Sequence, residues 1–152
     1  MSITVDGLAG IKALAGQHLG ESGWLEITQD RVNTFADATD DHQWIHVDPE
    51  RARSGPFGGP IAHGYLTLGL LIPLWSEILK IDNLRMAVNY GLNKVRFPSP
   101  VPVGAKIRVV AKLASVEDVA GDGVQAVVEL TVEREGSDKP AAVAEAVYRY
   151  YA

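Results

Sequence analysis

One long apolar segment, YLTLGLLIPLWSEIL from Tyr65 to Leu79, most constrains the fold of this chain. Its apolar residues are not confined to one stripe, which is typical of a helix enclosed on every side by the rest of the protein. The segment is shorter than the ~20 residues that span a bilayer, and it contains Pro73 and Glu77. We therefore expect a buried helix over Gly64–Leu79 that is kinked or locally broken at Pro73.

After residue 84 the periodicity of the sequence changes. Apolar and polar residues alternate with a period of two, which predicts strands that bury one face. The predicted strands cover residues 86–97, 105–113, 124–133 and 142–151. Glycine-containing turns at 121–123 and 135–137 separate the later strands, whereas three prolines between 98 and 102 predict a stiff, extended connection.

The first part of the chain is predicted to be mainly helical. Residues 6–16 are expected to form a short helix and residues 24–28 a short strand. Thr28 is placed as the N-cap of a helix that ends near Thr39, and Asp48 caps another that starts at Pro49. The run SGPFGGP, residues 54–60, is turn material. Helices followed by antiparallel strands predict an α+β fold whose sheet wraps the apolar helix.

Composition narrows the function classes. At 152 residues the chain is expected to form a single domain over 1–152. Its net charge is −5 and it has no run of Lys or Arg, so we expect it to bind neither nucleic acid nor a membrane surface. It has no cysteine, which excludes disulfides, thiolate nucleophiles and cysteine zinc sites. The N-terminus lacks a signal-peptide pattern, and a cytoplasmic location is expected.

The segment ATDDHQWIHVDPERA, residues 38–52, mixes titratable and bulky apolar groups. Burying unpaired charge costs several kcal/mol, so these acids and histidines need partners if they lie in the core. A solvated loop would have no need of Trp44 and Ile45. The mixture therefore indicates a polar site set in apolar walls.

Asp41 and His46 are the leading candidates for chemistry in this segment. They lie five residues apart in a predicted loop, where both side chains can turn toward one point. A carboxylate and an imidazole that share a water can move protons in both directions near neutral pH. The alternative is that Asp41 caps a helix or turn and that His46 is an ordinary half-buried histidine.

The same segment also contains candidate metal ligands. His42 and His46 are four residues apart, and His63 and several aspartates are available as further ligands. However, this spacing aligns two histidines only on a helix, and Trp44 and Pro49 favour a loop. We therefore expect no metal and no other cofactor.

His63 and Gly64 stand at the start of the predicted apolar helix. The first N–H groups of a helix lack internal partners, and Gly64 has no side chain to block an approaching carbonyl. Its amide is therefore a candidate donor to developing negative charge. The alternative is that Gly64 simply allows tight packing.

Two linked motifs resemble those of a known family. Asp41-His42-Gln43-Trp44-Ile45-His46, followed by Asp48-Pro49 and later by Ile61-Ala62-His63-Gly64, resembles the MaoC-like, R-specific enoyl-CoA hydratases of the hotdog superfamily. The family signature reads Asp-x-Asn-Pro-Ile-His, with Gly usual before the Asp. Here Gln43 and Trp44 replace the Asn and Pro, and Asp40 replaces the Gly. The Gln-Trp version resembles a branch that also includes NodN-like proteins.

The resemblance implies a fold, an assembly and a reaction. It implies a hotdog domain, in which an antiparallel sheet curls around the central helix, and a homodimer joined by its sheet edges. It also implies reversible hydration of a trans-2-enoyl-CoA to the (R)-3-hydroxyacyl-CoA without a cofactor. In that reaction Asp41 and His46 would hold the water, the Gly64 amide would polarise the thioester carbonyl, and Gln43 would orient the dyad or the carbonyl.

Further residues are implied as substrate contacts. The candidates for walls of an acyl site and for contacts to the carrier are Trp44, Phe57, His63, Tyr65 and Arg96. Arg85 and Lys94 join Arg96 as candidate cations for the coenzyme A phosphates. Two alternatives remain open: a hotdog acyl-CoA thioesterase, and a non-catalytic NodN-like module that binds acyl thioesters.

Overall fold

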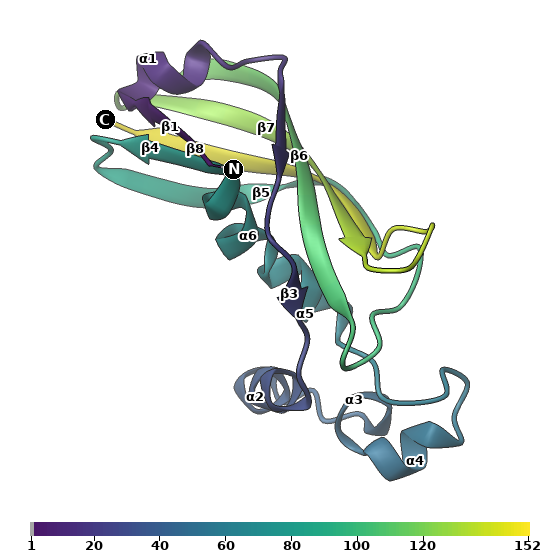
Figure 1. The fold of residues 1–152 in the computed structure, drawn as a ribbon. Helices are drawn as coiled ribbons and strands as arrows, with labels where there is room; N and C mark the ends of the chain where they lie inside the picture. The colour runs from purple at the N-terminus through teal and green to yellow at the C-terminus, as the bar shows by residue number, and fades with distance from the viewer. Residues whose placement is uncertain (1) are drawn as a thin grey trace.

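The computed structural model describes residues 2–152, which form a curved sheet packed on a broken helix (Figure 1). The elements in chain order are β1 (Ile3–Asp6), α1 (Gly7–Lys12), β2 (His18–Glu21), β3 (Leu25–Glu26), α2 (Gln29–Thr39), α3 (Trp44–Val47), α4 (Pro49–Arg53), α5 (Gly64–Gly69), α6 (Leu71–Ile78), β4 (Leu79–Asp82), β5 (Met86–Arg96), β6 (Lys106–Val119), β7 (Gly123–Arg134) and β8 (Ala142–Tyr151). The predicted α+β class is confirmed.

The main sheet has six strands, and its pairings are antiparallel. Its order is β2-β6-β7-β8-β5, with β3 also paired to β6, so β5 lies at one edge. The predicted alternation is confirmed, because the apolar positions predicted to face the core in β6 and β7 are each at most 1% exposed: Ile107, Val109, Ala111, Leu113, Val124, Ala126, Val128, Leu130 and Val132. β5 and β6 are not neighbours, as expected for a stiff connection between them.

The central helix is broken where the sequence predicted a break. α5 ends at Gly69 and α6 begins at Leu71, with Leu70 between them. Pro73 has no N–H to donate, and its ring crowds the carbonyl four residues earlier, which belongs to Gly69. The proline therefore explains a break that lies three residues before it.

The expectation that this helix is enclosed on every side is wrong for the single chain. Leu74 and Ile78 are buried against the sheet, whereas Tyr65 is 73% and Ile72 is 40% exposed. The sequence misled because the face turned away from the sheet is also apolar. At Ile72 this outward face borders the edge strand β5, since Ile72 and Val88 line the same pocket.

Several predicted boundaries need correction. The helix expected over residues 6–16 covers only Gly7–Lys12, because β1 precedes it and pairs in parallel with β4. The strand expected over 24–28 shortens to β3, and β2 was not predicted. β6 continues to Val119 because β7 pairs with it throughout a long hairpin. These differences all arise from pairing with distant segments.

Helices α2, α3 and α4 gather at one end of the molecule, beyond the sheet (Figure 1). Both predicted caps are confirmed: Thr28 accepts a hydrogen bond from the Arg31 amide at 3.1 Å, and Asp48 accepts one from the Arg51 amide at 3.1 Å. The C-cap residue of α2 is Asp40, whose φ of 59° lies in the left-handed region. Glycine adopts that conformation most easily, which explains why the family pattern has glycine there.

Within residues 2–152, none of the helices has the length and apolar character needed to cross a membrane.

Candidate active site

The candidate site forms where the chain between α2 and α3 meets the residues just before α5. The Ile61 amide donates to the Ile45 carbonyl at 2.9 Å, and the Ala62 amide donates to the Val101 carbonyl at 2.8 Å. Residues 61–64, the second segment of the site, are thus held between α3 and the chain that follows β5. One expectation is corrected: His46 lies on the short helix α3 and not in a loop, although Asp41 precedes that helix.

His46 is buried, and its ring orientation is fixed by the backbone. The side chain is 7% exposed, and Nδ1–H donates to the Ile61 carbonyl at 2.7 Å. A carbonyl can only accept, so the Nδ1 proton stays on the ring and Nε2 carries the lone pair of the neutral form. Burial lowers the pKa of His46 below its ordinary value, against the opposing effect of the Ile61 hydrogen bond. Nε2 is therefore suited to act as a base near neutral pH.

Gln29 also holds His46 in place. Its Nε2 amide donates to the His46 carbonyl at 2.8 Å and to the Asn33 side chain at 3.0 Å. This contact ties the start of α2 to α3. Nothing in the sequence around Gln29 predicted it, because the two residues are far apart in the chain.

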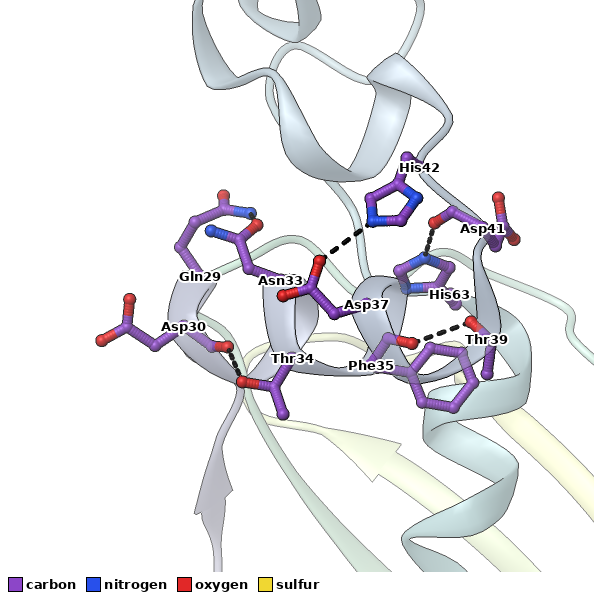
Figure 2. A network of polar contacts seen from close by, with 10 residues as sticks. All are labelled: Gln29, Asp30, Asn33, Thr34, Phe35, Asp37, Thr39, Asp41, His42 and His63. Atoms are coloured by element: carbon purple, nitrogen blue, oxygen red, sulfur yellow. Dashed lines mark hydrogen bonds and ion pairs between the residues drawn. The ribbon is translucent and has the colours of Figure 1, made fainter.

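His63 packs directly on His46. The ring centroids are 3.8 Å apart and the planes are inclined by 23°. Nε2–H of His63 donates to the main-chain carbonyl of Asp41 at 2.9 Å, as Figure 2 shows. The His63 ring also lies against Phe35, with the ring centroids 4.8 Å apart and the planes inclined by 54°. His63 is 3% exposed.

The Asp41 carboxylate is exposed, unlike the two histidines beside it. One donor atom from each of Asp41, His46 and His63 lies within 4.8 Å of the others. Two groups that hydrogen-bond to the same water stand about 4.5 Å apart, given ordinary bond lengths near 2.8 Å. The spacing between Asp41 and the imidazole therefore suits one shared water molecule.

These three residues are also the kind of side chains that bind metals. Each histidine already directs one nitrogen at a backbone carbonyl, so one nitrogen of each ring is left for any further partner.

Gly64 borders a pocket of about 330 Å³. Its amide begins α5 and is not hydrogen-bonded to any acceptor within residues 2–152. The Phe97 ring lies close to the glycine, since a Cβ added at Gly64 would stand 3.3 Å from that ring. The pocket is lined by Phe57, Ile61, Ala62, Gly64, Thr67, Phe97, Pro98, Ser99, Pro100, Val101 and Ala141. A residue with a free amide donor thus borders a mainly apolar hollow.

The other predicted residues are placed more loosely around the site. Gln43 is exposed, and only its main-chain carbonyl is engaged, by the His46 amide at 3.0 Å. Trp44 packs within the α3–α4 unit, where the Arg51 guanidinium lies 4.4 Å from its ring centroid. Phe57 lines the pocket beside Gly64, whereas Tyr65 is largely exposed.

The three candidate cations do not form one cluster. Arg85 precedes β5 and Arg96 ends it, so roughly 35 Å of extended chain separates them. Lys94 lines a pocket on the sheet with Lys112 and Glu129. Only Arg96 is next to Phe97 and the pocket at Gly64.

Known proteins resemble this chain over most of its length. Residues 11–135 match the family described as MaoC like domain. The chain is 56% identical to the 3-hydroxyacyl-thioester dehydratase Z of Mycobacterium tuberculosis, over 98% of this chain and 99% of that protein. It is 45% identical to nodulation protein N of Rhizobium leguminosarum bv. viciae, over 90% of this chain and 86% of that protein.

A solved structure shares the fold. The MaoC-like dehydratase from Rhodospirillum rubrum matches with a TM-score of 0.73 at 18% identity, over 90% of this chain and 92% of that chain. The predicted hotdog fold and the predicted kinship with NodN-like proteins are both confirmed. With both sequence motifs inside the matched region, this chain belongs to the family of MaoC-like domains.

Proposed function

We propose that this protein reversibly hydrates a trans-2-enoyl-CoA to the (R)-3-hydroxyacyl-CoA. The observation that carries the proposal is the orientation of His46, whose Nδ1–H is committed to the Ile61 carbonyl while an Asp41 carboxylate oxygen lies within 4.8 Å of one of its ring nitrogens. The mycobacterial relative is a 3-hydroxyacyl-thioester dehydratase by name, which supports a thioester substrate. The (R) configuration and the coenzyme A carrier are taken from the resemblance of the motifs.

In the proposed reaction Asp41 and His46 hold the attacking water between them. As the water oxygen bonds to C3, the dyad takes its proton, and the electron pair of the C2–C3 double bond moves toward the thioester oxygen. The dyad then delivers a proton to C2, so that H and OH are added and the enzyme is unchanged. Proton transfer by positioned side chains of this kind typically contributes about 10²–10⁴-fold in rate.

The Gly64 amide is the proposed donor to the thioester oxygen. Negative charge gathers on that oxygen only as the reaction proceeds, and an amide already in place needs no reorganisation to meet it. One such donor contributes on the order of 3 kcal/mol to the barrier. Phe57 and the adjoining apolar pocket would hold the acyl thioester, with Arg96 near the carrier.

The proposal is tested with crotonyl-CoA. We expect the ultraviolet absorbance of the conjugated enoyl thioester to fall without release of free thiol, and Asp41→Asn to remove this activity while keeping the fold. Thiol release would instead identify a thioesterase. If wild type and Asp41→Asn both fail with short, long, branched and carrier-bound enoyl groups while still binding them, the protein is an acyl-binding module.

A homodimer joined along β5 is the second part of the proposal. β5 lies at the edge of the sheet, and unpaired strand edges are normally protected or paired. The exposed large apolar residues on β5, on its end and on the neighbouring helix are Tyr65, Ile72, Met86, Tyr90, Leu92 and Phe97. A second copy of the chain would cover this surface and complete the strand pairing.

Sedimentation tests the dimer. Wild type is expected at twice the chain mass of 16.4 kDa, and Leu92→Glu, which places a charge in the middle of β5, is expected to shift it to monomer. Ala114→Glu is the matched control, because it adds the same charge at an exposed position of β6. A wild-type monomer at tens of micromolar concentration would rule out this assembly.

A further inference from the structure

The two buried histidines of the site connect its two chain segments reciprocally. His46, on the α3 side, donates to the Ile61 carbonyl of the second segment at 2.7 Å. His63, on the second segment, donates back to the Asp41 carbonyl at 2.9 Å. The two rings stack between these bonds at 3.8 Å. Each histidine thus braces the segment that carries the other.

His63 is what ties the Asp41 main chain to the rest of the site. Asp41 follows the left-handed residue Asp40 and is exposed, and its carboxylate has no hydrogen bond to any group within residues 2–152. Its main-chain carbonyl is bonded to His63 Nε2, as Figure 2 shows. The position of the carboxylate relative to His46 therefore depends on that bond.

The chain retains this histidine despite an unfavourable feature. His63 Nδ1 is buried and has no hydrogen-bond partner within the described residues. An unpaired buried acceptor costs free energy, and an apolar ring of the same shape would avoid that cost. Stacking alone does not require a histidine, so its Nε2–H is the feature that an apolar ring could not supply.

The surroundings of His63 leave little room for a substrate contact. The ring is stacked on His46 and lies against Phe35, and its Nε2–H is bonded to the Asp41 carbonyl. The side chain is 3% exposed. It can affect the reaction only through the groups that it holds.

We infer that His63 is a positioning residue, whose hydrogen bond to the Asp41 main chain and stack on His46 set the spacing of the catalytic pair. This rests on the proposed function for the identity of that pair. Misplacing a reacting group by about 1 Å can cost on the order of 100-fold in rate, so a side chain that never touches substrate can still control turnover.

Two variants separate the parts of this role. His63→Phe keeps a flat ring for the stack and removes the donor, and it also removes the unpaired nitrogen, so the protein is expected to stay folded. His63→Gln keeps an amide donor near the position of Nε2 and loses the ring. We expect kcat to fall roughly 10- to 100-fold in His63→Phe and less in His63→Gln, with KM within about 2-fold of wild type in both.

Phe35→Leu is the matched control. It loosens the packing around the His63 ring without removing a bond to Asp41 or His46, and kcat is expected to stay within about 3-fold. Wild-type kcat in His63→Phe, or a rise in KM with unchanged kcat, would overturn the inference. A loss in Phe35→Leu as large as in His63→Phe would do the same, since it would indicate packing alone.

A spectroscopic readout does not depend on activity. Nitrogen-15 NMR of the wild-type imidazoles is expected to show the proton on Nε2 of His63 and on Nδ1 of neutral His46. A proton on Nδ1 of neutral His63 would overturn the inference even in an active enzyme. Conversely, the expected tautomers in a protein that hydrates no enoyl thioester would refute the proposed function and leave the brace intact.

Discussion

His42 and His46 lie four residues apart, yet the fold treats them in opposite ways. The His42 side chain is 50% exposed and donates to the Asp37 carboxylate at 3.0 Å, which raises its pKa (Figure 2). His46 is 7% exposed and donates to a backbone carbonyl, and burial lowers its pKa. Residue type and spacing therefore do not decide which histidine is suited to act as a base; the surroundings do.

The difference follows from the direction in which each side chain leaves the backbone. His42 lies in the loop before α3 and turns toward the solvent-exposed surface of α2. His46 lies on α3 and turns inward, under the segment that precedes α5. A base with a lowered pKa keeps its lone pair available at neutral pH, whereas an imidazole hydrogen-bonded to a carboxylate holds its proton more strongly.

Activity should show the largest contrast between the two histidines. We expect His46→Gln to lower kcat/KM about 10²–10⁴-fold, the range found for a lost general acid–base group. His42→Gln, the matched control in the same segment, should stay within about 2-fold. Steady-state hydration kinetics on both purified variants, with circular dichroism to verify folding, would check this. Comparable losses in both would mean that His42 shares the chemistry.

A smaller effect should appear in the titration of the two rings. Proton NMR of the imidazole Cε1–H signals is expected to place the pKa of His46 below 6.5 and that of His42 above it. Replacing Asp37 by Asn should bring the pKa of His42 back toward 6.5 and leave His46 unchanged. The acid limb of kcat/KM should follow His46. An acid limb above pH 6.5 would contradict the assignment of His46 as the base.

The same shift has a consequence for stability, with a definite sign. Because the pKa of His46 is lower in the folded chain, the unfolded chain binds more protons between that pKa and 6.5. The free energy of unfolding should therefore fall as the pH drops below about 6.5. Above that pH the titration of His46 should no longer change the free energy of unfolding. In urea titrations from pH 7.5 to 5, His46→Gln should flatten this fall and His42→Gln should not.

Much of the fold could be predicted because it follows from local patterns. Alternation over 124–133 and 142–151 identified β7 and β8 almost to their ends, since a strand that buries one face must alternate. Thr28 and Asp48 identified helix starts, since the unpaired amides of a first turn need nearby acceptors. β1 and β4 were not predicted, because a four-residue strand is defined by pairing with its partner and not by its own sequence pattern.

The site was predicted only in part, for the same reason. Linked motifs singled out Asp41, His46 and Gly64 as candidates, because their spacing along the chain resembles that of a family signature. The contacts of Gln29, Phe35 and the Ile61 carbonyl gave no signal in the sequence. Each of them acts across a gap in sequence that no local pattern spans.

The sequence by itself determined the class of fold, the broken central helix and the candidates for reactive groups, because periodicity, proline chemistry and side-chain type are local properties. Only the tertiary structure decided which histidine is buried, which nitrogen carries its proton and what holds Asp41 beside it. Burial and hydrogen bonding depend on segments that meet only after folding, and it is these interactions that shift a pKa and fix a tautomer.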